Sequence, residues 1–266
     1  MKDSRWRSLM LRPHMRAWVA LLLAAVCSAG AGTEALRRDF HFQVIGGAQG
    51  LAQNSIAALL QDRAGYLWVG TQGGLQRYDG YSFRTFEHAE TDASGMGEGP
   101  VSALLEDAQG TIWIGTTGTG VARLDAVSGS IVRVPLPNAA SAELANVRAL
   151  ALDASGGIWA GTDAGISRID AKGAGMAAPL ALPRVEGRGA RVRQMKLADD
   201  GTLWIASSLG LYKLAAQSDT LERVGGDVLD DVAALLIDHD HRIYAGSYDG
   251  LYAVAAGGAA TRVWPE

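Results

Sequence analysis

The sequence predicts an all-β protein, a β-propeller built from four-stranded antiparallel blades, and three observations predict it. A ten-residue phrase, DRAGYLWVGT at 62–71, returns as DAQGTIWIGT at 107–116 and DASGGIWAGT at 153–162, with weaker copies at 199–207 and 238–247. The tryptophan or tyrosine in this phrase, called here the aromatic anchor, repeats every 40 to 46 residues. Short runs rich in Val, Ile, Leu, Trp and Tyr surround it, as strands require. Four short strands at this period are typical of a propeller blade.

The repeat extends beyond the phrase to other fixed positions. A β-branched residue stands twelve positions before each anchor, and a Gly-apolar pair follows six or seven positions after it. The agreement predicts five blade repeats at about 46–90, 91–138, 139–184, 185–224 and 225–266. The expected structural motif consists of Asp62, Gly65, Trp68, Asp107, Gly110, Trp113, Asp153, Gly156, Trp159, Trp204 and Tyr244.

Each repeat reads as four strands joined by tight turns. In the first repeat the expected strands are Ser55–Leu60, Tyr66–Gly70, Leu75–Tyr78 and Ser82–Phe86. The Asp-x-x-Gly pattern suits the first turn, because Asp accepts backbone hydrogen bonds and Gly tolerates the fourth position. The anchor on the second strand is expected to fill the space between neighbouring blades.

Residues 1–31 have the features of a secretory signal peptide. Five basic residues precede a short apolar core, Ala17–Val26, which is followed by small residues ending at Ala31. This order predicts export to the periplasm and leaves 32–266 as the propeller domain; an uncleaved membrane anchor is the alternative. The remainder has a net charge near −8 and lacks cysteine, since Cys27 is the only one. An acidic chain of this kind is not expected to bind nucleic acid or to depend on disulfides.

The segment 54–80, NSIAALLQDRAGYLWVGTQGGLQRYDG, resembles the two-component regulator propeller repeat. The resemblance extends over about 39–266 and is looser in the last two repeats, where Ala198, His241 and Tyr244 replace the usual Asp, Gly and Trp. It implies the periplasmic sensor region of a bacterial signal-transduction protein, either a hybrid histidine kinase or a diguanylate cyclase.

The same resemblance implies seven blades, so the five repeats indicate an incomplete ring. Phe40–Ile45 resembles a fourth strand that would close such a ring, and no kinase or cyclase motif occurs in the sequence. The expectation is a truncated or split sensor whose output domain is absent from this chain. A closed five-bladed ring is the alternative.

Candidate catalytic and metal-binding residues are few. The aspartates recur at one turn position, which indicates turn capping rather than catalysis, and His239 and His241 are expected to be solvated turn residues. Calcium in the turns is the weaker alternative, because the oxygen spacing of a calcium loop is missing. The expectations are therefore no enzyme, no cofactor and no metal. Four basic residues recur near Asp79, Asp125 and Asp170, and they are expected to form a solvated face with weak ion pairs: Arg77, Arg123, Arg168 and Lys213. Binding of an anionic ligand by these residues is the alternative.

A ligand is expected to bind to the loops that join the second and third strands of each repeat, or to the loops that lead into the first strand. The candidates there are Asn54, Gln72, Thr117, Asn146, Asp163, Ser208 and Tyr248. The expected partner is an extracellular small molecule or glycan, with a homodimer or a separate signalling chain also considered. Contact with a membrane is expected only through a missing downstream region or an uncleaved signal. Two other functions remain as alternatives: a propeller enzyme, such as a lyase or glycan hydrolase, and a protein-interaction scaffold.

Overall fold

A computed structural model describes residues 42–86, 95–137, 141–153, 155–170, 172–185, 188–255 and 257–264. The expected signal peptide at 1–31 lies outside these residues. The chain divides into two compact units, Met1–Val44 and Ile45–Glu266, and the second contains the repeats. Of the expected strand Phe40–Ile45, the described residues 42–45 do not form a strand. Within the described ranges, no helix is long and apolar enough to cross a membrane.

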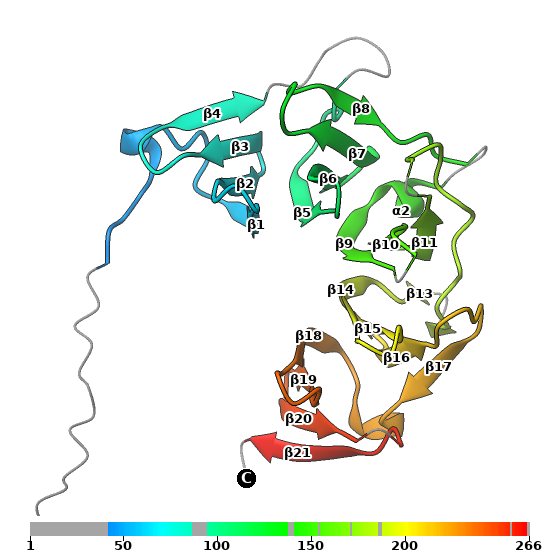
Figure 1. Cartoon of the computed structure of the whole chain (residues 1–266). Helices are drawn as coiled ribbons and strands as arrows, with labels where there is room; N and C mark the ends of the chain where they lie inside the picture. The colour runs from blue at the N-terminus through cyan, green and yellow to red at the C-terminus, as the bar shows by residue number, and fades with distance from the viewer. Residues whose placement is uncertain are drawn as a thin grey trace, which may run out of the picture. The chain divides into compact units, whose positions relative to one another are not determined.

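Five antiparallel sheets follow one another along the second unit, which confirms the predicted blades (Figure 1). In each sheet, neighbouring strands are also consecutive in the chain. The first sheet contains β1 (Ile56–Gln61), β2 (Leu67–Thr71), β3 (Gly74–Tyr78) and β4 (Phe83–Phe86). The second contains β5 (Val101–Glu106), β6 (Thr111–Thr116), β7 (Gly120–Asp125) and β8 (Ile131–Arg133). The third contains β9 (Val147–Leu152), β10 (Ile158–Thr162) and β11 (Gly165–Ile169).

The remaining elements complete this pattern. The fourth sheet contains β14 (Val192–Leu197), β15 (Leu203–Ser207), β16 (Gly210–Leu214) and β17 (Leu221–Val224). The fifth contains β18 (Val232–Ile237), β19 (Ile243–Ser247), β20 (Gly250–Val254) and β21 (Ala260–Trp264). Between sheets lie η1 (Gly47–Gln49), α2 (Ala142–Ala145), the hairpin β12 (Arg184–Val185) and β13 (Arg188–Gly189), and η2 (Gly226–Val228).

The Asp-x-x-Gly turn forms as the sequence predicts. The Gly65 N–H donates to the Asp62 carbonyl across 2.9 Å, and Gly65 has a φ of 91°, a conformation that favours glycine. The Asp62 carboxylate accepts the Tyr66 N–H across 2.9 Å, which fixes the start of β2. The turn therefore places the anchor Trp68 two residues further on.

The core consists of four apolar clusters, each of which joins two successive sheets. The anchors contribute to these clusters, with Trp68 fully buried and Trp113 only 1% exposed. The clusters account for the short apolar strands, because each sheet needs a neighbour on both faces to bury its side chains. The cluster between the first two sheets contains Trp68, Leu75, Phe86, Met96, Val101, Ile112, Ile114, Ala122 and Leu124.

The first and fifth sheets each retain an apolar face without such a neighbour. Among the described residues, no core cluster joins these two sheets. Leu59 in the first sheet is 60% exposed, and Leu236 and Trp264 in the fifth are 57% and 68% exposed. The fifth sheet already has a fourth strand of its own in β21.

The third sheet departs from the predicted pattern of four regular strands. The segment after β11 meets it through two isolated bridges, Ile169 to Met176 and Ile166 to Leu180. The bridged residues are three positions apart on β11 and four positions apart on the partner segment, so the pairing contains an irregularity. Pro179 lies inside it, and proline has no N–H to donate to a strand ladder.

Candidate ligand-binding face

The turns between second and third strands carry five of the seven residues that the sequence proposes for ligand binding. Each of these five stands four positions after its anchor. Their exposure differs, since Tyr248 is 80% exposed whereas Asp163 is half-buried. We call these turns, together with the residues that lead into each first strand, the second-turn face.

Three predicted residues meet where the second and third sheets adjoin. Thr117 forms an isolated antiparallel bridge with Asn146. The Asn146 side-chain amide donates to the Asp163 carboxylate across 3.3 Å, and the Asp163 N–H donates to the Asn146 carbonyl across 3.3 Å. These contacts make Thr117, Asn146 and Asp163 one continuous polar cluster.

Arg148 joins this cluster from β9. Its guanidinium donates two hydrogen bonds to Asp163, with Nη2 lying 2.9 Å from Oδ2. These bonds, opposed by partial burial and aided by the charge of Asp163, raise the pKa of Arg148 above its ordinary value. Arg148 therefore stays charged and holds the turn in place.

Arg193, at the same register position on β14, forms a second charged group. It pairs with Asp231, its Nη2 lying 2.5 Å from the carboxylate, and its guanidinium carbon lies 5.6 Å from the centre of the Tyr248 ring. These contacts bring Tyr248 together with residues of the fourth sheet. An aromatic ring held by an arginine presents an apolar surface beside polar groups.

Sequence reasoning missed both arginines. They stand eleven positions before their anchors, where the other three repeats have Ala57, Ser102 and Ala233. The signal that could have revealed them is a basic residue at a repeat position where the other repeats have a small residue.

The remaining predicted residues make local contacts or lie apart. Ser208 exchanges hydrogen bonds of 3.0 Å with the backbone of Arg191. Gln72 and Asn54 are exposed. Of the predicted set, the structure therefore brings together Thr117, Asn146 and Asp163, and it places Tyr248 beside an arginine that the prediction did not include.

The recurring charged residues behave differently from the prediction. Arg168 pairs with Asp153 rather than with Asp170, since its Nη2 lies 2.7 Å from the Asp153 carboxylate. Asp170 instead accepts the backbone N–H groups of Lys172 and Ala174. Arg168 therefore pairs across the sheet and not with its neighbour in sequence, because the short Asp170 side chain caps its own turn.

Other recurring charges follow the same rule. Asp79 and Asp125 cap their own turns, and Arg77 lies over the Tyr66 ring at 4.2 Å. Lys213 pairs with Glu222 across 3.2 Å.

His239 and His241 occupy an exposed turn, as the sequence predicts. The side chain of His239 is 90% exposed, and that of His241 is 68% exposed and lies 3.0 Å from Asp199. Within the described ranges, no group of three or more His, Cys, Asp or Glu residues is placed to hold a metal ion.

The fold and the recurring turn define the chain as a β-propeller, and comparison with known proteins identifies its repeats. Residues 50–73 and 95–118 match the model of the two component regulator propeller family. The first and second repeats are therefore similar to the repeat of that family. A 61-residue stretch is also 34% identical to Histidine kinase P4 of Formosa agariphila. This stretch is 23% of this chain and 4% of the kinase.

Solved structures support the same fold. The extracellular domain assigned to a hybrid two component system of B. thetaiotaomicron superimposes with a TM-score of 0.70 at 22% identity, over 82% of this chain and 31% of that one. Virginiamycin B lyase from Staphylococcus aureus gives a TM-score of 0.63 at 16% identity, over 79% of this chain and 69% of the lyase. At these identities the likeness shows the fold alone. The chain thus spans under a third of the first of these proteins.

Proposed function

We propose that this chain is the ligand-sensing propeller of a bacterial signal-transduction protein, acts in the periplasm and is not itself an enzyme. The observation that carries the proposal is the match of two segments to the two component regulator propeller family. The first structural relative, an extracellular domain of a hybrid two component system, supports the location. A kinase or cyclase output would then belong to another part of the same system.

The second-turn face is the proposed ligand site. Two arginines of this face are paired, Arg148 with Asp163 and Arg193 with Asp231, so neither of these two offers an unpaired charge. Tyr248 adds a largely exposed aromatic ring. Paired charges beside an exposed ring favour an uncharged polar ligand, such as an extracellular small molecule or glycan, over a free anion.

Signalling would follow from ligand affinity. A ligand can shift a conformational equilibrium only by as much as it prefers one state over the other. In the proposed mechanism, the ligand favours one pose of the propeller relative to its signalling partner, either a second copy or a separate chain.

The lyase function of a structural relative is not favoured here. The repeated aspartates that would supply acids are already used, since Asp62 and Asp107 each accept both a backbone N–H and an indole N–H. No particular observation favours catalysis over binding.

Thermal unfolding with a panel of uncharged oligosaccharides and cell-envelope extracts tests the ligand site. A ligand that binds the folded chain and not the unfolded chain raises its Tm, and the increase grows with the ratio of ligand concentration to Kd. We expect at least one panel member to raise the Tm of the wild type and to lose this effect in Tyr248→Ala and Arg193→Ala. Tyr81→Ala is the matched control, because Tyr81 is 94% exposed in the β3–β4 turn. A Tm increase that survives in both site variants would exclude this face as the site.

Export can be tested separately. Alkaline phosphatase fused after residue 266 should be active if residues 1–31 direct export, and inactive when these residues are deleted. Activity without residues 1–31 would contradict the proposed signal peptide.

A further inference from the structure

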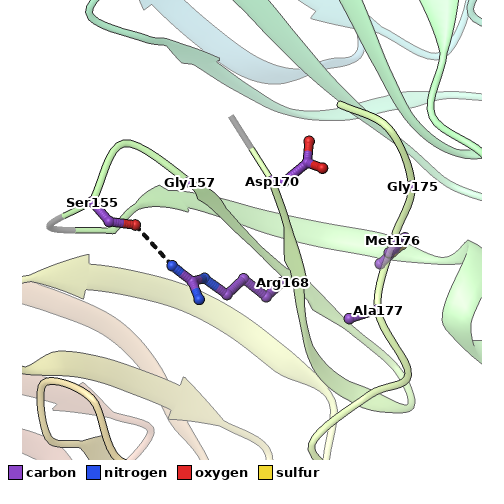
Figure 2. A pocket seen from close by; sticks show the side chains of 7 residues that line it. All are labelled: Ser155, Gly157, Arg168, Asp170, Gly175, Met176 and Ala177. Atoms are coloured by element: carbon purple, nitrogen blue, oxygen red, sulfur yellow. Dashed lines mark hydrogen bonds between the residues drawn. The ribbon is translucent and has the colours of Figure 1, made fainter. Parts of the chain in front are cut away.

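A cavity of about 680 Å³ lies between the third and fourth sheets, apart from the second-turn face. A second cavity of about 500 Å³ adjoins it, and both are lined by Ser155, Arg168 and Ala177 (Figure 2). Cavities of several hundred Å³ are of the size that holds small ligands. We call the pair the third-sheet cleft.

The cleft exists because the third sheet has no regular fourth strand. The segment from Met176 to Leu180 meets β11 through two isolated bridges and a hydrogen bond of 2.9 Å from the Ala177 N–H to the Arg168 carbonyl, and it does not form a continuous ladder. Ala177, Ala178 and Leu180 line the larger cavity from this side. On the other side Leu203 and Leu214 of the fourth sheet form an apolar wall.

The anchor of the third sheet is the one that lines this cavity. In the first two sheets the indole N–H of the anchor donates to the turn aspartate, from Trp68 to Asp62 across 2.7 Å and from Trp113 to Asp107 across 2.8 Å. Trp159 makes no such bond with any residue that the structure describes. It is also half-buried, whereas Trp68 is fully buried.

Arg168 takes the place of the indole. Its Nε donates to Asp153 Oδ2 across 2.8 Å, and its Nη2 donates to the Ser155 hydroxyl across 2.7 Å, a bond drawn in Figure 2. Gly157 explains this change, because at the same position the first sheet has Tyr66, whose ring holds Arg77. A Cβ at Gly157 would lie 2.8 Å from Asp153 Oδ2, so a side chain there is incompatible with this carboxylate position.

The result is a cavity with donors and acceptors on an apolar floor. The Trp159 indole N–H and the remaining N–H groups of Arg168 are donors, and the Arg168 side chain is 53% exposed. Gln217, Ser218 and Asp219 add acceptors from the β16–β17 turn of the fourth sheet.

The charge of the lining limits the class of ligand. Three aspartates, Asp153, Asp170 and Asp219, line the cleft together with one guanidinium, that of Arg168, which Asp153 already neutralises. An anion would therefore meet net negative charge. Hydroxyl groups both donate and accept, and the apolar face of a sugar ring can pack on an indole ring.

We propose that the third-sheet cleft is a second binding site, which takes an uncharged polyhydroxylated ring compound of mono- or disaccharide size. The ring stacks on Trp159, and its hydroxyl groups bond to Arg168 and to the β16–β17 turn. This site is separate from the second-turn face and goes beyond the proposed function.

NMR of the indole N–H groups tests the proposal on the full chain. Glucose, galactose, maltose and cellobiose serve as uncharged probes, with glucuronate as the anionic arm, and Trp159→Phe assigns the Trp159 signal. We expect at least one uncharged sugar to shift this signal with a Kd of about 1 mM or tighter. Arg168→Gln should weaken that binding roughly tenfold, as the loss of a charge-assisted hydrogen bond implies.

Arg123→Gln is the matched control, because Arg123 has the same register position in the second sheet and does not line the cleft. If Arg168→Gln fails to fold, Asp219→Ala, in the exposed β16–β17 turn, takes its place as the variant of the cleft. The proposal is overturned if none of the uncharged sugars shifts the Trp159 signal, if glucuronate binds more tightly than they do, or if both cleft variants bind as the wild type does. Tyr248→Ala should leave this titration unchanged, so failure here and failure of the proposed function are distinguishable.

Discussion

The indole N–H of Trp113 donates a hydrogen bond to the carboxylate of Asp107 across 2.8 Å. The same carboxylate accepts the backbone N–H groups of Gln109 and Thr111, each across 2.9 Å. One buried aspartate therefore fixes both the turn before β6 and the ring that packs between sheets. The same bond from Trp68 to Asp62 accounts for the six-residue spacing of Asp and Trp in the first two repeats.

Replacing Asp107 with alanine should destabilise the fold substantially. The substitution leaves a buried indole N–H without a partner and removes the turn cap. We expect a loss of about 3 kcal/mol in the free energy of unfolding, measured by urea denaturation. Asp79→Ala is the control, because Asp79 caps an exposed turn with two backbone hydrogen bonds and holds no indole. An equal loss in both variants would show that the turn cap alone matters.

Gly161 lies where the third sheet packs closely against Val192 of the fourth sheet. A Cβ there would lie 2.4 Å from Val192 Cγ1, and similar approaches occur at Gly70 and Gly115. Gly161→Ala should therefore overpack this interface and cost about 1–3 kcal/mol, read from the shift in urea midpoint. Gly246 has the same register position in the fifth sheet, but a Cβ there would come no closer than 3.5 Å to Ala234. Gly246→Ala should be tolerated, and equal losses at both positions would contradict the packing argument.

The blades were predictable because their signal is repeated and local. Most repeats contain the turn aspartate and a tryptophan anchor at the same spacing, so errors at one position are corrected by the others. The expected strand Leu75–Tyr78 differs from β3 only in beginning one residue late. The irregular third sheet was not predicted, because Pro179 lies in a segment without a repeated motif and its effect depends on pairing with β11.

The candidate site was predictable only in part. Position in the repeat located the turns that contain Asp163 and Tyr248, since every second turn stands at the same distance from its anchor. Their partners Arg148 and Arg193 lie 15 and 55 residues away in the chain, and only the fold brings them close. The Arg168–Asp153 bond was missed for a related reason, because it depends on the missing side chain at Gly157.

Acid should weaken the third sheet through Asp153. Burial raises the pKa of Asp153, but hydrogen bonds from Ser155 and Gly157 outweigh it and hold the pKa below its ordinary value of 3.8. A carboxyl whose pKa is lower in the folded chain contributes stability above its unfolded pKa, and this contribution is lost as the pH falls through the folded pKa.

Asp153→Asn tests this contribution. The variant should be less stable than the wild type near neutral pH, and the difference should shrink as the pH falls below about 4. Urea denaturation across this pH range measures it. A difference that is constant with pH would show that the effect of the substitution is steric rather than electrostatic.

Phe86 and Trp264 compare an internal sheet face with an exposed one. Each residue pairs with the same register position of its third strand, Phe86 with Leu75 and Trp264 with Leu251. Phe86 is 7% exposed and packs against the Trp68 ring at 5.2 Å, whereas Trp264 is 68% exposed.

Phe86→Ala should lower the free energy of unfolding by about 3–5 kcal/mol, because it opens a cavity in the cluster between the first two sheets. Trp264→Ala should change stability by less than about 0.5 kcal/mol. Urea denaturation at two protein concentrations provides the measurement. A large loss in Trp264→Ala that grows with protein concentration would mean that another chain covers the fifth sheet, and the exposed face would then be an interface.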